Sequence, residues 1–261
     1  MEIVQHICMH SPAAREHAMR LLRAGHNDCE VARRTGISRT TIRDWRRPRY
    51  VPRPTSRAAA RNSVTCPCCW LGGRPMAFTS NDYAELLGLY LGDGHVVRHA
   101  RTCRFRLFLD SRHSQIVRES RALLQRCFPH NDIGTVFGHE GRMTVLSVYS
   151  SHLPCVFPQH GEGRKHLRKI TLENWQQAIV EDAPWNFLKG CIRSDGCSFI
   201  NRTGPYEYLS YQFSNHSPDI LDLFCWACDL VGLEYRRYAQ AVRVNRRRSV
   251  ARLKDEIGVK R

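Results

Sequence analysis

A repeated block constrains the fold of this chain more than any other feature. LLGLYLGDG, at residues 86–94, aligns without a gap with LKGCIRSDG, at residues 188–196. Each block reads as an apolar helix that carries small residues four positions apart and ends in Asp-Gly, so two such helices could pack closely along their backbones. The small residues are Gly88, Gly92, Gly190 and Ser194. Strand-like alternation, a polar turn and another helix follow each block, which predicts a duplicated α+β domain.

The paired blocks resemble the motifs of LAGLIDADG homing endonucleases, spaced as in members that carry both motifs on one chain. The resemblance implies that residues 80–261 form two αββαββα repeats, at about 80–160 and 184–261. The two motif helices would form the central interface, and two curved sheets would make a saddle over double-stranded DNA. The chain would then bind DNA as a single-chain pseudo-dimer.

The two motif helices end in Asp93 and Asp195, which are the candidate catalytic residues and Mg²⁺ ligands. Two carboxylates that meet at the bottom of paired helices can hold Mg²⁺ between the DNA strands and activate water for attack on a phosphodiester. An acidic pair that faced DNA without a metal would repel its ligand. The alternative is that each Asp-Gly only stops a helix and starts a turn.

A basic residue near the metal commonly helps enzymes of this family, yet the first repeat, from Leu86 to about His160, contains no lysine. In the second repeat Lys254 follows a segment that reads as strand-rich, and we assign it as the candidate catalytic lysine. Lys165, Lys169 and Lys189 are assigned to structure or to phosphate contact.

Helix breakers and caps divide residues 11–47 into three short helices. Asn27 can cap the second helix, Ser38 can cap the third, and Pro48 ends it. A domain of this size and composition suits a helix-turn-helix at residues 1–50.

Within this stretch Ala32, Gly36 and Ile42 fall at the spacing of a helix-turn-helix. There a small residue lets two helices cross, a glycine makes the turn, and an aliphatic residue fixes the recognition helix. The alternative is a small bundle with a solvated basic face. The candidate DNA-contacting residues of the third helix are Ser38, Arg39, Thr40, Thr41, Arg43 and Arg47.

Residues 51–79 read as a basic linker with a CPCC element. Within it, Cys66 and Cys69 form a CxxC pair, which supplies half of a tetrahedral Zn²⁺ site. The other CxxC pair, Cys225 and Cys228, lies in an apolar stretch that predicts a buried helix. Zinc therefore stays an open possibility.

A run of arginines near the C-terminus is interleaved with tyrosines and valines, which predicts a sheet with one basic face suited to a DNA backbone. The alternative is a solvated hairpin with Asn245 in its turn. The arginines assigned to DNA contact are Arg236, Arg237, Arg243, Arg246, Arg247 and Arg248.

The charge balance agrees with a nucleic-acid partner, because 40 Lys and Arg against 24 Asp and Glu give a formal net charge of +16. No apolar run is long enough to span a membrane, and no signal peptide is visible. We therefore expect no membrane partner and a cytoplasmic, nucleoid-associated location. The twelve cysteines are expected to be reduced.

Together these patterns predict a sequence-specific DNA-binding protein that acts as a Mg²⁺-dependent DNA endonuclease. The whole arrangement is also similar to bacterial LAGLIDADG-like proteins of the WhiA type, some of which are treated as regulators. A non-cleaving transcription regulator, with the helix-turn-helix for specificity and the saddle for phosphate contacts, is the alternative. A protein-interaction platform is a third possibility, and it predicts DNA affinity with little salt dependence.

Overall fold

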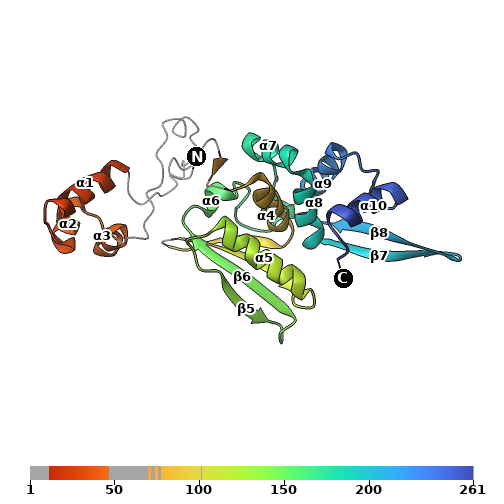
Figure 1. Cartoon of the computed structure of the whole chain (residues 1–261), viewed down its shortest axis with the longest axis horizontal. Coiled ribbons are helices and arrows are strands. Elements are labelled where there is room, and N and C mark those ends of the chain that lie inside the picture. The colour runs from red at the N-terminus through yellow and green to blue at the C-terminus, as the bar shows by residue number, and fades with distance from the viewer. Residues whose placement is uncertain (1–11, 47–69, 72–73, 76–77, 101, 261) are drawn as a thin grey trace. The chain divides into compact units, whose positions relative to one another are not determined.

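The computed structural model divides into two compact units, Met1–Met76 and Ala77–Arg261 (Figure 1). The structure describes residues 12–46, 70–71, 74–75, 78–100 and 102–260. No helix in the described part of the chain is long and apolar enough to cross a membrane.

The N-terminal unit contains the three predicted helices, which are α1 (Pro12–Arg23), α2 (Asp28–Thr35) and α3 (Arg39–Arg46). The predicted cap of α2 is confirmed, because the Asn27 side chain accepts hydrogen bonds from the backbone N–H groups of Cys29 and Glu30 at 3.1 and 3.0 Å. Gly36 ends α2 in the left-handed region, at φ +69°, a conformation that glycine adopts at little cost. The turn predicted at this glycine is therefore present.

A small apolar core holds the three helices together. Ala18, Val31, Ile37 and Ile42 are fully or almost fully buried, and Trp45 packs against them. Ile42 fixes α3 onto α2 as the helix-turn-helix spacing predicts. Farther along this unit, a short antiparallel pair joins β1 (Trp70–Leu71) and β2 (Arg74–Pro75).

The larger unit consists of two repeats with the same element order. The first comprises α4 (Ser80–Asp93), β3 (Gly94–Arg98), β4 (Cys103–Asp110), α5 (Ser114–Cys127), β5 (Gly134–Gly138), β6 (Met143–Ser150) and α6 (Leu153–Val156). The 3₁₀ turn η3 (Lys165–Leu167) and α7 (Asn174–Asp182) join it to the second. The second comprises α8 (Pro184–Arg193), β7 (Gly196–Thr203), β8 (Tyr206–Ser214), α9 (Pro218–Leu230), β9 (Arg236–Arg237), β10 (Ala241–Val244) and α10 (Arg247–Glu256). The predicted α+β class and the duplicated αββαββα order are confirmed.

Each repeat forms one four-stranded antiparallel sheet, with strand orders β3-β4-β6-β5 and β7-β8-β10-β9. The register also matches, since Gly94 pairs with Leu107 and Gly196 pairs with Phe213. In β4 buried Cys103, Phe105, Leu107 and Leu109 alternate with half-buried residues, as expected of a strand with one face on a core. The half-buried residues of β4 lie on the opposite face of the sheet, away from this core.

The motif helices α4 and α8 pack against each other through glycine (Figure 1). A Cβ on Gly88 would lie 2.5 Å from the carbonyl oxygen of Phe187 and 2.9 Å from the Cα of Gly190. A Cβ on Gly190 would in turn lie 3.0 Å from the Cα of Gly88. Any side chain at either position would force the helices apart, so the predicted backbone-to-backbone approach is confirmed.

A buried ion-pair cluster crosses the same interface. Glu85 of α4, which is almost fully buried, accepts hydrogen bonds from Lys189 at 2.9 Å and from Arg193 at 2.7 Å, both on α8. Arg193 also bonds Glu119 of α5. Because each buried charge has a partner of opposite sign, the cluster fixes the alignment of the two helices without leaving an unpaired charge.

Candidate acidic centre and nucleic-acid interface

The two aspartates lie where a motif helix turns directly into a strand. Asp93 is the last residue of α4, Asp195 follows the end of α8, and each is followed by a glycine that begins a strand. A Cβ on Gly94 would lie 2.5 Å from the Cα of Tyr90, and the second glycine of the repeat has the same contact with the last turn of α8. The glycine is therefore required by the close return of the strand against the helix, and Gly94 itself has an ordinary φ of −85°.

The carboxyl groups of Asp93 and Asp195 share one crowded environment. A Cβ on Gly92 would lie 3.3 Å from the Cγ of Asp195, which places this carboxyl against the C-terminal turn of α4. Burial, together with the negative charge of Asp195, raises the pKa of Asp93 to about 7. Burial also raises the pKa of Asp195, although a 2.6 Å hydrogen bond from Asn215 Nδ2 opposes that rise. Two partly desolvated carboxyls of this kind would be stabilised by a cation.

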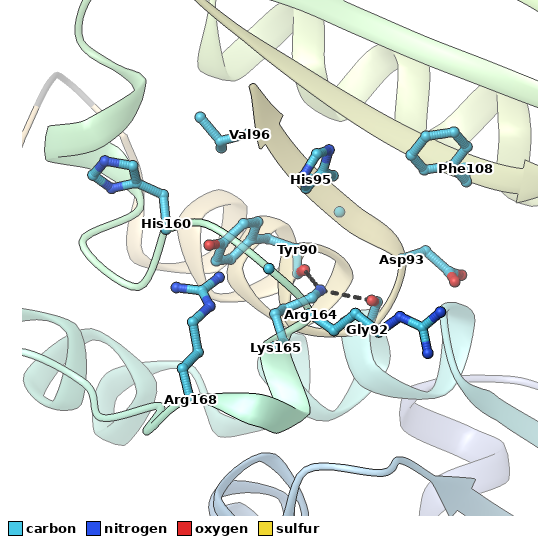
Figure 2. A pocket seen from close by; sticks show the side chains of 13 residues that line it. Tyr90, Gly92, Asp93, His95, Val96, Phe108, His160, Arg164, Lys165 and Arg168 are labelled. Atoms are coloured by element: carbon cyan, nitrogen blue, oxygen red, sulfur yellow. Dashed lines mark hydrogen bonds between the residues drawn. The ribbon is translucent and has the colours of Figure 1, made fainter. Parts of the chain in front are cut away.

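Two lysines lie at the ends of the same helices. Lys165 Nζ donates hydrogen bonds to the carbonyl oxygens of Tyr90, Leu91 and Gly92 at 2.5, 2.7 and 2.7 Å, and Figure 2 shows this side chain beneath the last turn of α4. Lys260 Nζ donates to the carbonyl oxygen of Ser194, after α8, at 2.6 Å. The positive charges of Lys165 and Lys260 oppose the rise in the pKa of the two aspartates. A cation at a helix C-terminus also interacts favourably with the helix dipole.

Burial lowers the pKa of Lys165 to about 8, while the two aspartates oppose the shift. The pKa of Lys260 is lowered for the same reason. Each lysine follows the last helix of its own repeat and returns to the motif helix of that repeat. The sequence prediction ended the first repeat at His160 and so did not assign Lys165 to this centre.

The candidate catalytic lysine of the sequence prediction lies elsewhere. Lys254 is exposed on the helix α10, where the sequence suggested a strand-rich segment, and it lines a pocket with Glu85, Glu119 and Arg193. The lysines whose charges act on Asp93 and Asp195 are Lys165 and Lys260. The strand prediction was wrong because Ser249, Val250 and Leu253 repeat at helical spacing and pack inward.

A pocket of about 330 Å³ opens beside Asp93. Figure 2 shows Tyr90, His95 and Phe108 on one side and the side chains of the segment that joins the repeats on the other. Its basic residues are His160, Arg164, Lys165 and Arg168. His95 Nδ1 lies 3.1 Å from Arg106 Nη2, and burial lowers the pKa of this histidine, so it is neutral at pH 7. An acid next to several cations suits a phosphate group held close to a metal-binding carboxylate.

The donor set fits Mg²⁺ better than Zn²⁺. Among the described residues no cluster of three or more His, Cys, Asp or Glu side chains could hold a metal, so the centre offers two carboxylates. Mg²⁺ is commonly held by one or two carboxylates, with water and substrate phosphate as its other ligands. Cys66 and Cys69 lie outside the described residues. Cys225 and Cys228 are buried in α9, as predicted, where burial raises the pKa of both thiols.

The outward faces of the two sheets carry matching rows of polar residues that begin beside the acidic centre. In the first sheet His95 pairs with Arg106 across β3 and β4, and Ser147 follows on β6. Next to this row Arg104 donates to Ser147 Oγ at 3.1 Å and lies over the ring of Tyr149 at 5.2 Å. Contacts with Ser147, Tyr149 and His95 therefore hold these two arginines on this face of the sheet.

In the second sheet the corresponding row runs from Cys197 through Gln212 and Arg243 to Arg236. Arg243 Nε donates to Gln212 Oε1 at 2.6 Å, and its guanidinium lies over the ring of Tyr238 at 5.4 Å. The structure thus places two of the six predicted arginines on this face.

The other four predicted arginines lie elsewhere, so the prediction of a single basic sheet face is wrong for them. Arg237 is opposite the buried Val242 and bonds Asp222 of α9 at 3.2 Å. β10 ends at Val244, and Arg246, Arg247 and Arg248 are exposed at the start of α10. The alternative hairpin with a turn at Asn245 is equally wrong, because a helix follows.

In the N-terminal unit, α3 presents the predicted contact face. Ser38, Arg39, Thr40 and Arg43 are exposed, and Thr41 is half-buried. Ser38 Oγ accepts a hydrogen bond from the backbone N–H of Thr41 at 3.2 Å, which confirms it as the cap of α3. Arg47 lies outside the described residues. The described part of this face is polar.

Comparisons with known proteins agree with the two-part organisation. A family model of homeodomain-like domains matches residues 9–48. No curated protein matches the chain.

Solved structures that resemble the chain include the homing endonuclease I-DmoI in complex with DNA and Mn, with 17% identity over 69% of this chain and 97% of that chain and a TM-score of 0.49. Mesophilic variants of I-DmoI match with 19% identity over 69% of this chain and 96% of that chain, with a TM-score of 0.47. The N-terminal LAGLIDADG domain of DUF199/WhiA matches with 15% identity over 72% of this chain and 87% of that chain, with a TM-score of 0.44.

Proposed function

We propose that the chain is a sequence-specific, double-stranded DNA-binding protein that cleaves DNA with Mg²⁺ at Asp93 and Asp195. The observation that carries the proposal is the meeting of two desolvated carboxyls at the ends of paired helices, with Lys165 and Lys260 beside them. Two carboxylates buried close together destabilise the fold, because like charges repel and lose hydration. A purely structural role would not explain why both acids are placed there.

Asp93 and Asp195 would hold Mg²⁺, and the outward rows of the two sheets would hold the duplex across them. When bound, the metal lowers the pKa of a water molecule and stabilises the negative charge that develops on the phosphate. Arg164 and Arg168 line the pocket beside Asp93 and would orient the phosphate there. Lys165 and Lys260 keep the two helix ends in place while the charge on the carboxyls changes.

DNA selection would be shared between the two units. The homeodomain-like segment supplies α3 for a major groove, where Arg39 and Arg43 are exposed. The larger unit would bind a second stretch of the same duplex as a single-chain pseudo-dimer, through the rows that include Arg106 and Arg243. The net charge of +16 supports this assignment, since counterion release favours binding to DNA.

A non-cleaving transcription regulator is the second candidate, and one observation favours it. A lysine ammonium has three N–H donors, and Lys165 uses three contacts on backbone carbonyls. This lysine therefore has no donor left to polarise an attacking water. In a regulator the acids and lysines would serve only to fasten the motif helices.

The test begins by selecting the preferred DNA from fragmented genomic DNA with the full chain. That DNA is then incubated with Mg²⁺ and either the native protein or the Asp93→Asn, Asp195→Asn double variant, and strand breaks are read on a gel. We expect breaks with the native protein only, and equal binding by both. Tight binding without breaks would contradict cleavage and support the regulator. DNA affinity with little salt dependence would instead support a protein-interaction platform.

A further inference from the structure

We propose that the side chains at the contact between α4 and α8 determine which repeats pair, so that the first repeat accepts the second repeat and rejects a second copy of itself. Selection comes from an ion-pair cluster on one side of the contact and from a glycine opposite a serine at its end. The inference rests on the fold alone, so it is independent of DNA binding and of cleavage.

The backbones of the two motif helices do not select a partner. The repeats have the same element order and strand order, and Gly88 and Gly190 occupy equivalent positions. A Cβ on either glycine would meet the backbone of the other helix, so both helices present a similar flat surface. With this surface alone, α4 would pack against α4 of a second copy as well as it packs against α8. Selection must come from the side chains around the glycines.

An ion-pair cluster lies on one side of the contact. Glu85 on α4 is 5% exposed and accepts hydrogen bonds from Lys189 and Arg193 on α8. Arg193 also donates to Glu119 on α5, whose other carboxylate oxygen accepts a 2.8 Å hydrogen bond from Gln115 Nε2. The first repeat therefore contributes the two acids of the cluster, and the second repeat contributes the two bases.

The equivalent positions on the other side of the contact are apolar. In the gapless alignment of the motif helices, Phe187 is the counterpart of Glu85, and Leu87 and Leu91 are the counterparts of the two bases. Phe187, Leu87 and Leu91 are fully buried. Because the helices meet at equivalent glycines, Phe187 has the same place relative to the two leucines as Glu85 has relative to the two bases.

This difference between the two sides disfavours both of the other pairings. If α4 packed against α4 of a second copy, each Glu85 would face two leucines instead of two bases. If α8 packed against α8, Lys189 and Arg193 would face Phe187. A buried charge that has lost its partner is strongly destabilising, whereas the pairing of α4 with α8 leaves no charge of the cluster unpaired.

The glycine and the serine at the end of the contact add selection by shape. A Cβ on Gly92 would lie 2.5 Å from the Cβ of Ser194. The Ser194 hydroxyl fills this place and donates to the carbonyl oxygens of Gly190 and Cys191, each at 3.0 Å. The contact thus has room for one side chain here, and two copies of α8 would bring two serines together.

The selection matters while the chain is being made. The first repeat is synthesised before the second, so its α4 surface has no partner until α8 follows, and exposed apolar surface of this kind favours misassembly. The charge of Glu85 would keep this surface from joining the same surface of a neighbouring chain.

The experiment uses the full-length protein, refolded from urea, with its mass measured by size-exclusion chromatography and light scattering at several concentrations. In the double variant Lys189→Glu, Arg193→Glu the four groups of the cluster are all acidic, which separates α8 from α4. The triple variant adds Glu85→Phe, which gives α4 the residue type of its counterpart on α8. We expect the triple variant to form a species of twice the mass of the 30.2 kDa chain, and the double variant to form none.

Two matched variants control the result. Glu207→Phe, added to the double variant in place of Glu85→Phe, puts the same apolar residue on an exposed strand and should not produce dimers. Combining the double variant with Glu85→Lys and Glu119→Lys reverses every charge of the cluster and should restore the mass and the Tm of the native protein.

Dimers of the double variant, a triple variant without dimers, or equal dimerisation with Glu207→Phe would overturn the proposal. If the double and triple variants do not refold, the variant with every charge reversed decides. Its recovery would support selection by opposite charges, and its failure to recover would overturn it.

Discussion

Replacing Asp93 by Asn should stabilise the metal-free protein, and the gain should grow with pH. Asp93 has a pKa of about 7 in the folded protein, against an ordinary value of 3.8, because of burial and the nearby charge of Asp195. A folded-state pKa above the unfolded one means that the folded protein binds the proton more tightly. Its stability therefore falls as pH rises from 3.8 to 7.

The size of this effect follows from the same shift. Each unit of pKa difference corresponds to about 1.4 kcal/mol. Folding is therefore disfavoured by roughly 4 kcal/mol at pH 8, where the carboxyl is ionised in both states, and by roughly 2 kcal/mol at pH 5, where the carboxyl must take up a proton as the chain folds. Asparagine has nearly the same shape and no charge. The stability advantage of Asp93→Asn over the native protein should thus increase by about 2 kcal/mol between pH 5 and pH 8, or about 5 °C in Tm for a unit of this size.

Differential scanning calorimetry of the full chain in EDTA would measure this difference in the transition of Ala77–Arg261. Asp132→Asn, at an exposed position, is the control and should behave like the native protein at both pH values. If Asp93→Asn is no more stable than the native protein at pH 8, or if the difference in stability is the same at pH 5 and pH 8, then burial and the charge of Asp195 do not raise the pKa of Asp93 as the structure indicates.

Three further changes test other parts of the structure. In excess Mg²⁺ at pH 8 the Tm of the native protein should rise while that of Asp93→Asn should not, and an equal rise in both would place the metal elsewhere. Lys165→Met should destabilise the protein by about 2–4 kcal/mol in urea unfolding, because three carbonyls of α4 lose a charged donor, whereas the exposed Lys169→Met should have little effect. Gly190→Ala should cost about 1–3 kcal/mol in the same assay because its Cβ would meet the backbone of α4, and a neutral result would contradict the close helix contact.

Much of the fold could be predicted because local and long-range patterns agree. The small residues of the two motif helices predict their contact, and Gly88 and Gly190 meet as expected. The caps at Asn27 and Ser38 are read from the residues themselves, since capping is a local interaction. The acids could be chosen from their place at the end of each motif helix, where the structure also brings them together.

The lysines and arginines of the site could not be placed in the same way. Lys165 reaches α4 from a loop that carries no periodic pattern, and Lys260 follows the last helix of the chain. The segment that leads into Lys254 was read as strands because Val242 and Val244 alternate with polar residues, but β10 is only four residues long. Long side chains on short, charged segments depend on the assembled fold, and sequence spacing alone does not determine where they reach.

The contact of Lys165 with α4 has a consequence for recombining the two halves of this protein. The segment between the repeats is usually the natural place to exchange one half for another. Here a junction placed directly after α6 would separate α4 from the lysine that closes its last turn, and would supply the new half with a cation that has no partner. We therefore expect chimaeras joined after Lys165 to be more stable than chimaeras joined directly after α6.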